Sequence, residues 1–191
     1  MTDAIAETAA RPVPPVGRVG VSGMWAFLAT DAMGFGALFI AYAVLRVRAP
    51  SWPDPRARLD LVPAAAMTFA LLGSSFTMTW EARAERGPAR GSWLLATLLL
   101  GSGFLAGQLR EYHHLWRASA PLRIGPDLYA STFYALTGYH GLHVAIGLLS
   151  LLILAVSGSR RRTLEVAALY WHFVDLAWMP IFTFVYLVPA R

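Results

Sequence analysis

Histidine and aspartate stand at helical spacing inside two of the most apolar stretches of the chain. The segment ALTGYHGLHVAIGLL carries His140 and His143, three residues apart. The segment LYWHFVDLAW carries His172 and Asp175 at the same separation. Because residues three apart share one face of a helix, each pair presents two polar groups to the same neighbour. Such pairs serve three kinds of chemistry: ligation of a metal ion or haem, transfer of protons, and hydrogen bonding that locks helices together.

A third apolar stretch, FLATDAMGFGALF, contains Asp31. A lone acid at membrane depth costs on the order of 3 kcal/mol to insert, so Asp31 is expected to face protein or water rather than lipid. A proton-handling or inter-subunit contact and a packing acid held by hydrogen bonds both fit this position. His113 and His114 follow the polar stretch QLREY and are expected at solvent or at lipid headgroups.

The composition of the chain is that of a membrane protein. Of its 191 residues, 57% are hydrophobic and 14% are charged, which is too apolar for an ordinary soluble domain. The absence of cysteine excludes disulfides and thiolate metal sites. The net charge of +5 comes from arginine without lysine, and the arginines lie in short clusters between apolar runs. That placement is typical of anchors at lipid headgroups, so no nucleic-acid partner is expected.

Five apolar runs are long enough to cross a bilayer as helices. A hydrocarbon core about 30 Å thick needs about 20 residues at about 1.5 Å per residue, and backbone groups in lipid must be satisfied within the segment. The predicted spans are residues 23–45, 62–80, 93–109, 129–156 and 166–188. We therefore predict an all-α membrane protein, a five-transmembrane-helix bundle over residues 21–191, preceded by a mobile N-terminal tail, residues 1–20.

The polar residues of three spans fall at similar depth. By helical rise, Asp31 lies about 12 Å and Asp175 about 14 Å into spans that run in the same direction. His140 and His143 lie about 16 and 21 Å into the fourth span, which runs the opposite way. An imidazole of the fourth span is therefore expected to pair with a carboxylate of the fifth, which lowers the cost of burying both. Haem ligation by His143 and His172 is the alternative, whereas zinc lacks a third ligand.

Two long motifs lie in the last two spans: YASTFYALTGYHGLHVAIGLL, residues 129–149, and LEVAALYWHFVDLAW, residues 164–178. Both resemble subunit III of the haem–copper respiratory oxidases, the cytochrome c/quinol oxidase subunit III family. Weaker similarities to the same family are FLATDAMGFGALF, GSSFTMTW and GQLREY. The resemblance covers nearly everything after the tail. It points to the five-helix bacterial type, since mitochondrial-type members have seven spans.

The resemblance implies an accessory function in aerobic electron transport. Subunit III of a proton-pumping oxidase binds no haem or copper, stabilises the catalytic subunit I against turnover-linked inactivation and supports proton uptake. No cofactor is therefore expected on this chain; haem and copper belong to partner subunits, and structural phospholipid is expected. The expected partners are subunit I by direct contact, subunit II and other chains of the complex, and membrane lipid. The expected location is the bacterial inner membrane, with multiple spans.

The resemblance also assigns residues. Asp31 matches the family's buried carboxylate near subunit I, where a glutamate is usual. An inter-helix polar network that fixes the bundle is assigned to Glu111, His140, His143, Glu165, His172 and Asp175. No catalytic or metal-binding residue is expected. The chain departs from the family after the TW motif, where Glu81, Ala82 and Arg83 replace histidines that often follow it.

Three other functions fit parts of the pattern. A related five-span protein accompanies nitric oxide reductases. A b-type cytochrome would use His143 and His172 as haem ligands and would show a Soret band. A small proton-linked transporter would use Asp31 and the histidines as a path, and would show flux in proteoliposomes.

Overall fold

The computed structural model of the chain describes residues 16–83, 91–118, 122–125, 127–157 and 161–189. Five long helices lie within these residues, and the described part contains no strand: α1 (Val16–Arg48), α2 (Leu61–Arg83), α3 (Ser92–Arg117), α4 (Leu128–Val156) and α5 (Arg161–Ile181). All five are long and apolar enough to cross a membrane. The predicted all-α fold and the five predicted spans are confirmed.

Two helices are longer than the apolar runs indicated. The first begins at Val16, so the end of the predicted tail is helical, while residues 1–15 lie outside the described residues. The third runs to Arg117, well past the predicted end at residue 109. Its last two turns carry exposed His113 and His114 on one side and the buried Leu115 on the other. Hydropathy placed the end of this span too early, because the last turns of the helix are amphipathic and their mean hydropathy is that of a loop.

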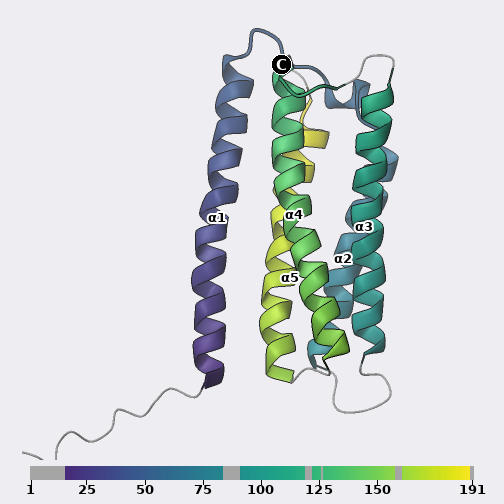
Figure 1. Ribbon diagram of the computed structural model, residues 1–191. Helices are drawn as coiled ribbons and strands as arrows, with labels where there is room; N and C mark the ends of the chain where they lie inside the picture. The colour runs from purple at the N-terminus through teal and green to yellow at the C-terminus, as the bar shows by residue number, and fades with distance from the viewer. Residues whose placement is uncertain (1–15, 84–90, 119–121, 126, 158–160, 190–191) are drawn as a thin grey trace, which may run out of the picture.

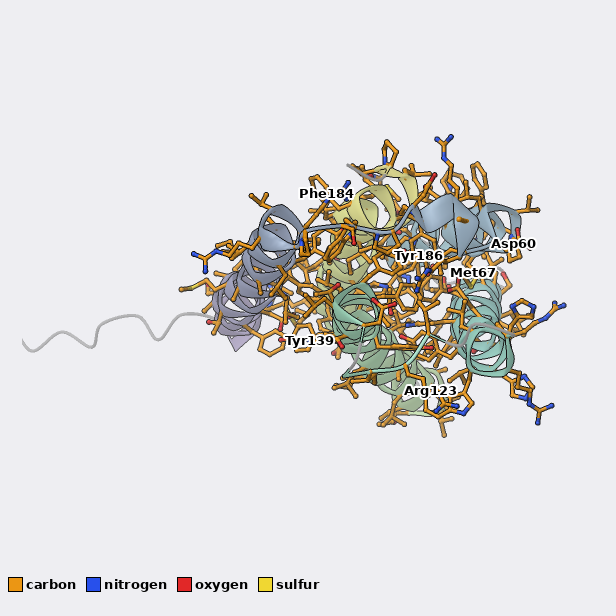
Figure 2. All side chains as sticks on the ribbon, turned by 90° about the horizontal axis from the view of Figure 1, so that it is seen from above. Asp60, Met67, Arg123, Tyr139, Phe184 and Tyr186 are labelled. Atoms are coloured by element: carbon orange, nitrogen blue, oxygen red, sulfur yellow. The ribbon has the colours of Figure 1, made fainter. Side chains whose placement is uncertain are left out.

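Four of the helices surround a common core, and the first lies at its edge (Figures 1 and 2). Neighbouring pairs are α2 with α3, α3 with α4, α4 with α5, and α5 with α2, whereas α1 packs mainly on α4 and α5. Only 17% of the most apolar part of α1 is buried, against 50% for the last span. The first helix is thus the one held by the fewest contacts.

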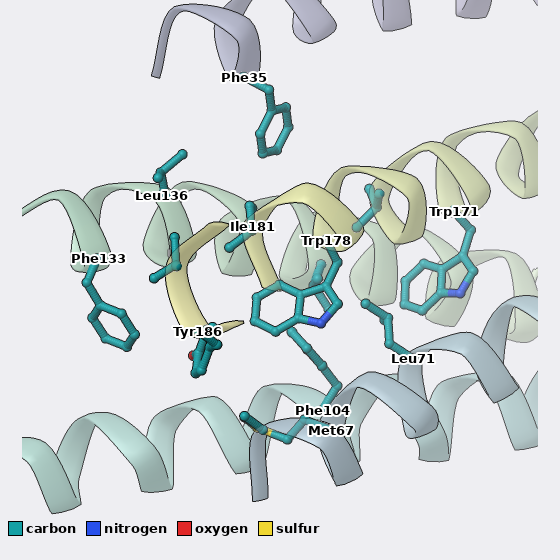
Figure 3. Close-up of a cluster of buried hydrophobic side chains, with 14 of the residues drawn as sticks. Phe35, Met67, Leu71, Phe104, Phe133, Leu136, Trp171, Trp178, Ile181 and Tyr186 are labelled. Carbon is teal, nitrogen blue, oxygen red and sulfur yellow. The ribbon is translucent and has the colours of Figure 1, made fainter. Parts of the chain in front are cut away.

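Two tryptophans of α5 fill the centre of the core (Figure 3). Trp171 and Trp178 are at most 1% exposed, and each indole N–H donates to a hydroxyl of α2, on Ser74 at 3.0 Å and on Thr68 at 2.9 Å. The ring of Phe104 packs edge-on against Trp178, with centroids 4.8 Å apart. Each buried N–H therefore has an acceptor, which is the condition for burying an indole at no polar cost.

Trp171 is also pressed between two glycines, which gives a testable prediction. A Cβ at Gly101 would lie 2.8 Å from its ring, and one at Gly147 would lie 2.9 Å from it. Gly101→Ala is expected to destabilise the protein by about 1–3 kcal/mol through overpacking. Gly103→Ala, on the same helix with nothing within 4 Å, is the matched control and is expected to be neutral or slightly stabilising. Thermal unfolding in detergent measures both, and equal melting temperatures would contradict the prediction.

The last helix ends in an irregular segment that other helices hold. After Pro180, α5 passes into a π-helix, η2 (Phe182–Leu187). The hydroxyl of Tyr42 donates to the carbonyl of Phe184 at 2.7 Å, and that of Tyr129 donates to the carbonyl of Val185 at 3.1 Å. Phe184 and Val185 lie at the end of η2, where the last carbonyls of a helix have no N–H further along it, so these two phenols satisfy them.

Candidate functional site

A buried acid and a buried histidine meet between α1 and α4. His143 Nε2 lies 3.0 Å from Asp31 Oδ1, and both side chains are 9% exposed. The hydroxyl of Tyr139 donates to the same carboxylate oxygen at 3.2 Å. The helices approach closely here, because a Cβ at Gly34 would lie 2.9 Å from the Tyr139 hydroxyl. Glycine at this position allows the three polar groups to touch.

The hydrogen bonds determine how many protons this pair holds. His143 Nδ1 lies 2.7 Å from the carbonyl oxygen of Tyr139, which accepts only, so Nδ1 carries a proton. A hydrogen bond between Nε2 and Asp31 then requires one further proton, which belongs either to an imidazolium or to a carboxylic acid. The pair has no net charge in either form. Two ionisable groups that share one proton are therefore buried without a lone charge in the membrane.

The other carboxylate oxygen of Asp31 is buried and has no hydrogen-bond partner among the described residues. The ring of Phe35 lies 5.3 Å from that of His143, on the apolar side of the pair. This arrangement provides what a proton-holding site needs, a shared proton and an acceptor in reserve.

The predicted pairing of the fourth span with the fifth is not what the structure shows. His143 pairs with α1, as above. His172 contacts α2 instead, where its Nδ1 lies 2.6 Å from Ser75 Oγ and its Nε2 lies 3.3 Å from Thr79 Oγ1. Asp175 interacts with the same Ser75 hydroxyl. The expectation was wrong because two helices that follow each other in the chain can pack together while their polar side chains contact other helices.

His140 lies in the middle of the core and makes no hydrogen bond within the described part of the chain. It is fully buried, with the ring of Trp178 5.0 Å away and that of Phe104 5.5 Å away. Although it shares a helix face with His143 in sequence, its contacts are aromatic. His140 is thus a packing residue of the aromatic core rather than a partner of the acid.

The two glutamates assigned to the network are far from equivalent. Glu111 of α3 accepts a hydrogen bond from the hydroxyl of Tyr186 at 2.7 Å, which ties α3 to η2. Glu165 is exposed near the start of α5. Glu111, His143 and His172 thus form separate hydrogen bonds between helices.

Two buried polar contacts escaped the sequence reasoning. Glu81 is 3% exposed, and its carboxylate accepts from the backbone N–H of Gly91 at 3.0 Å and of Leu94 at 3.2 Å. Gln108 donates from Nε2 to the carbonyl of Thr137 at 2.6 Å and to the hydroxyl of Tyr112 at 2.9 Å. The sequence does contain an indication of the Glu81 contact, because this acid comes directly after an apolar run and shortly before the next helix.

Histidines and acids do not converge on a metal site in the described residues. No group of three or more such side chains there is placed to hold an ion. His143 and His172, the alternative haem ligands, bond to different helices. The geometry therefore gives haem ligation by this pair no support.

Two apolar cavities flank α1. One, of about 400 Å³, lies between α1 and η2 and is lined by Phe39, Ile40, Tyr42, Ala43, Arg46, Val47, Phe184 and Val188. The guanidinium of Arg46 is its cationic group and donates to the hydroxyl of Tyr42 at 3.0 Å. The other, of about 520 Å³, lies between α1, α4 and α5, with Met24, Ile153 and Tyr170 among its walls. Both have the apolar lining that suits an acyl chain.

Comparisons with known proteins point in one direction. Residues 15–189 match the family described as "Cytochrome c oxidase subunit III". The chain is 39% identical over 180 residues to "Cytochrome c oxidase subunit 3" of Synechocystis, covering 87% of this chain and 74% of the relative. It is 37% identical over 177 residues to "Probable cytochrome c oxidase subunit 3" of Mycobacterium bovis, covering 87% and 86%. It is 35% identical over 184 residues to "Quinol oxidase subunit 3" of Bacillus spizizenii, covering 90% and 88%.

Proposed function

Since the chain belongs to the cytochrome c oxidase subunit III family, we propose that it packs beside the catalytic subunit I of a haem–copper terminal oxidase and supports its proton uptake. It does so in the bacterial inner membrane, in a complex that also contains subunit II. It has no catalytic centre of its own; the haem and copper are held by the partner subunits.

The single observation that carries this proposal is the 3.0 Å contact between His143 Nε2 and Asp31 Oδ1, which needs one proton between the two groups. The pair lies in the contact of α1, the helix at the edge of the bundle, and not in the central core. A group there is close to whatever packs on α1. Because the pair is neutral with its proton in either position, moving that proton between the two groups creates no lone charge. The site is thus suited to hold a proton beside a neighbouring subunit.

Asp31→Asn tests this role. An asparagine amide can donate to His143 Nε2 and accept from Tyr139, so the fold and assembly are expected to persist while the exchangeable proton is lost. We expect normal haem spectra, with slower proton uptake or a several-fold shorter working lifetime during turnover. Asp60→Asn, the same exchange at an exposed carboxylate directly before α2, is the control. Wild-type uptake and inactivation kinetics in Asp31→Asn would reduce Asp31 to a packing residue.

We propose further that the cavity beside Arg46 holds a structural phospholipid. Its walls are apolar, and the guanidinium at its margin suits a phosphate. Ala43→Trp fills the cavity and is expected to lower the phospholipid phosphorus retained per purified complex. Ala41→Trp, exposed on the same helix but not in the lining, is the control. Equal phospholipid in the two variants would exclude this cavity as the binding site.

A further inference from the structure

A polar cluster lies on the outer side of the contact between α2 and α5. It consists of Ser75 and Thr79 of α2 with His172 and Asp175 of α5, and we name it the α2–α5 seam. In Figure 2, α2 and α5 line one side of the bundle and α4 lies on the opposite side. The indole of Trp171 and the other core side chains lie on the inner side of this cluster. The seam is therefore at the surface of the bundle.

One acceptor atom within the seam has no donor among the described residues. The hydroxyl of Thr79 donates to the carbonyl of Ser75 at 3.0 Å, so it can only accept from His172 Nε2. The hydroxyl of Ser75 has one proton for two neighbours, His172 Nδ1 and Asp175. Asp175 is 9% exposed, and its Oδ1 is buried with no partner among the described residues. The seam thus holds an acceptor that nothing described in the chain satisfies.

The position of this acceptor makes lipid a poor neighbour. Asp175 lies midway along the span Arg162–Leu187, far from either headgroup region. Acyl chains carry no donor, and polar groups at this depth face protein or a water-filled cavity. His172 is only half-buried, so the seam is open on its outer side. Exposed apolar side chains border it, with Leu176 68% and Leu72 38% exposed.

We propose that the α2–α5 seam is the docking face for a transmembrane helix of a neighbouring subunit, which brings an N–H or O–H donor to the depth of Asp175. The inference rests on the proposed function, which places the chain in a complex of several subunits, and it names a second contact face besides α1. A second copy of this chain does not fit, because symmetric docking would bring two donor-poor carboxylates together. The apolar border and polar centre together match a helix that carries one polar side chain among apolar ones.

Site-specific photocrosslinking in membranes that contain the assembled complex tests the docking face. Benzoylphenylalanine replaces Leu72 and Leu176 at the seam. It also replaces Leu99 of α3 and Leu142 of α4, which are 65% and 57% exposed and serve as controls on other faces. We expect crosslinks to another subunit from the two seam positions, and several-fold fewer from the controls. Crosslinks chiefly from the controls, or none from the seam, overturn the docking face. A chain that neither crosslinks nor co-purifies with any oxidase subunit would instead refute the proposed function.

The carboxylate itself is tested by retention in the complex. Asp175→Leu removes the acceptor and is expected to lower co-purification with the partner chains several-fold, whereas Asp175→Asn keeps an acceptor oxygen and is expected to retain most of it. Thermal unfolding of each variant subunit separates docking from folding. Retention that falls only as far as thermal stability falls, or equal retention in both variants, would contradict a docking role.

Discussion

Replacement of His143 with leucine is expected to destabilise the contact of α1 with α4 by about 2 kcal/mol. Removing one partner of a buried ion pair in soluble proteins costs about 3–5 kcal/mol, because the remaining charge is left uncompensated. Interhelical hydrogen bonds in membranes contribute less, about 0.6–1.7 kcal/mol, since the unfolded chain also finds partners there. The expected value lies between these limits and corresponds to a factor of about 30 in the equilibrium constant.

The measurement is equilibrium unfolding of the purified protein in mixed micelles, compared with Asp31→Asn, with Asp31→Leu and with the double variant Asp31→Leu/His143→Leu. The double variant leaves no unpaired ionisable group, so it is expected to be more stable than His143→Leu alone. Asp31→Asn is expected to remain within about 0.5 kcal/mol of the wild type, as for substitutions that leave no buried group unpaired. Additive effects of the two leucines would show that the groups do not interact.

Replacement of Glu81 with alanine is expected to destabilise the protein by about 3 kcal/mol. The carboxylate is buried and accepts backbone N–H groups of Gly91 and Leu94, at the start of α3. Hydrogen bonds to a charged group contribute about 1.5–3 kcal/mol, and the positive end of the helix dipole adds up to about 2 kcal/mol. Alanine leaves both N–H groups without this acceptor, and that of Leu94 is buried.

Glu81→Gln is the matched variant, because it keeps one acceptor oxygen and loses the charge. Its destabilisation is expected to be less than half that of alanine. Hydrogen exchange at the amides of Gly91 and Leu94 reports the same contact locally and is expected to accelerate in Glu81→Ala. Unchanged exchange there, or equal stability of the alanine and glutamine variants, would show that the cap does not stabilise α3.

Apolar run length predicted the five spans because lipid demands a continuous apolar stretch and internal hydrogen bonding. Helix ends were less predictable. The last turns of α3 are polar on one side only, and Glu111 is satisfied by Tyr186, a residue far along the chain. The residues around Glu111 in the sequence do not indicate that its partner lies in η2. The start of α1 at Val16 was also not predicted, because the glycine- and valine-rich residues that open this helix are not typical of a helix start.

The candidate site was predictable in its members but not in its pairs. Depth follows from helical rise, so Asp31 and His143 were expected at similar levels. Which helices lie side by side is a property of the packed bundle, and α1 turned out to be the neighbour of α4. Glu81 was read as a departure from a family motif. Its role became visible only once α3 was seen to begin beside it.

The peripheral position of α1 has a consequence for synthesis of the protein. The first helix is made first, but Asp31 bonds a histidine 112 residues later in the chain. At about 5–20 residues per second, the ribosome needs roughly 5–20 s to reach it. During that interval Asp31 cannot bond to His143, because His143 has not yet been translated. The carboxyl group of Asp31 must then be solvated by water or by polar groups of the insertion machinery. Insertion of the first helix into lipid is therefore least favourable before α4 has been synthesised.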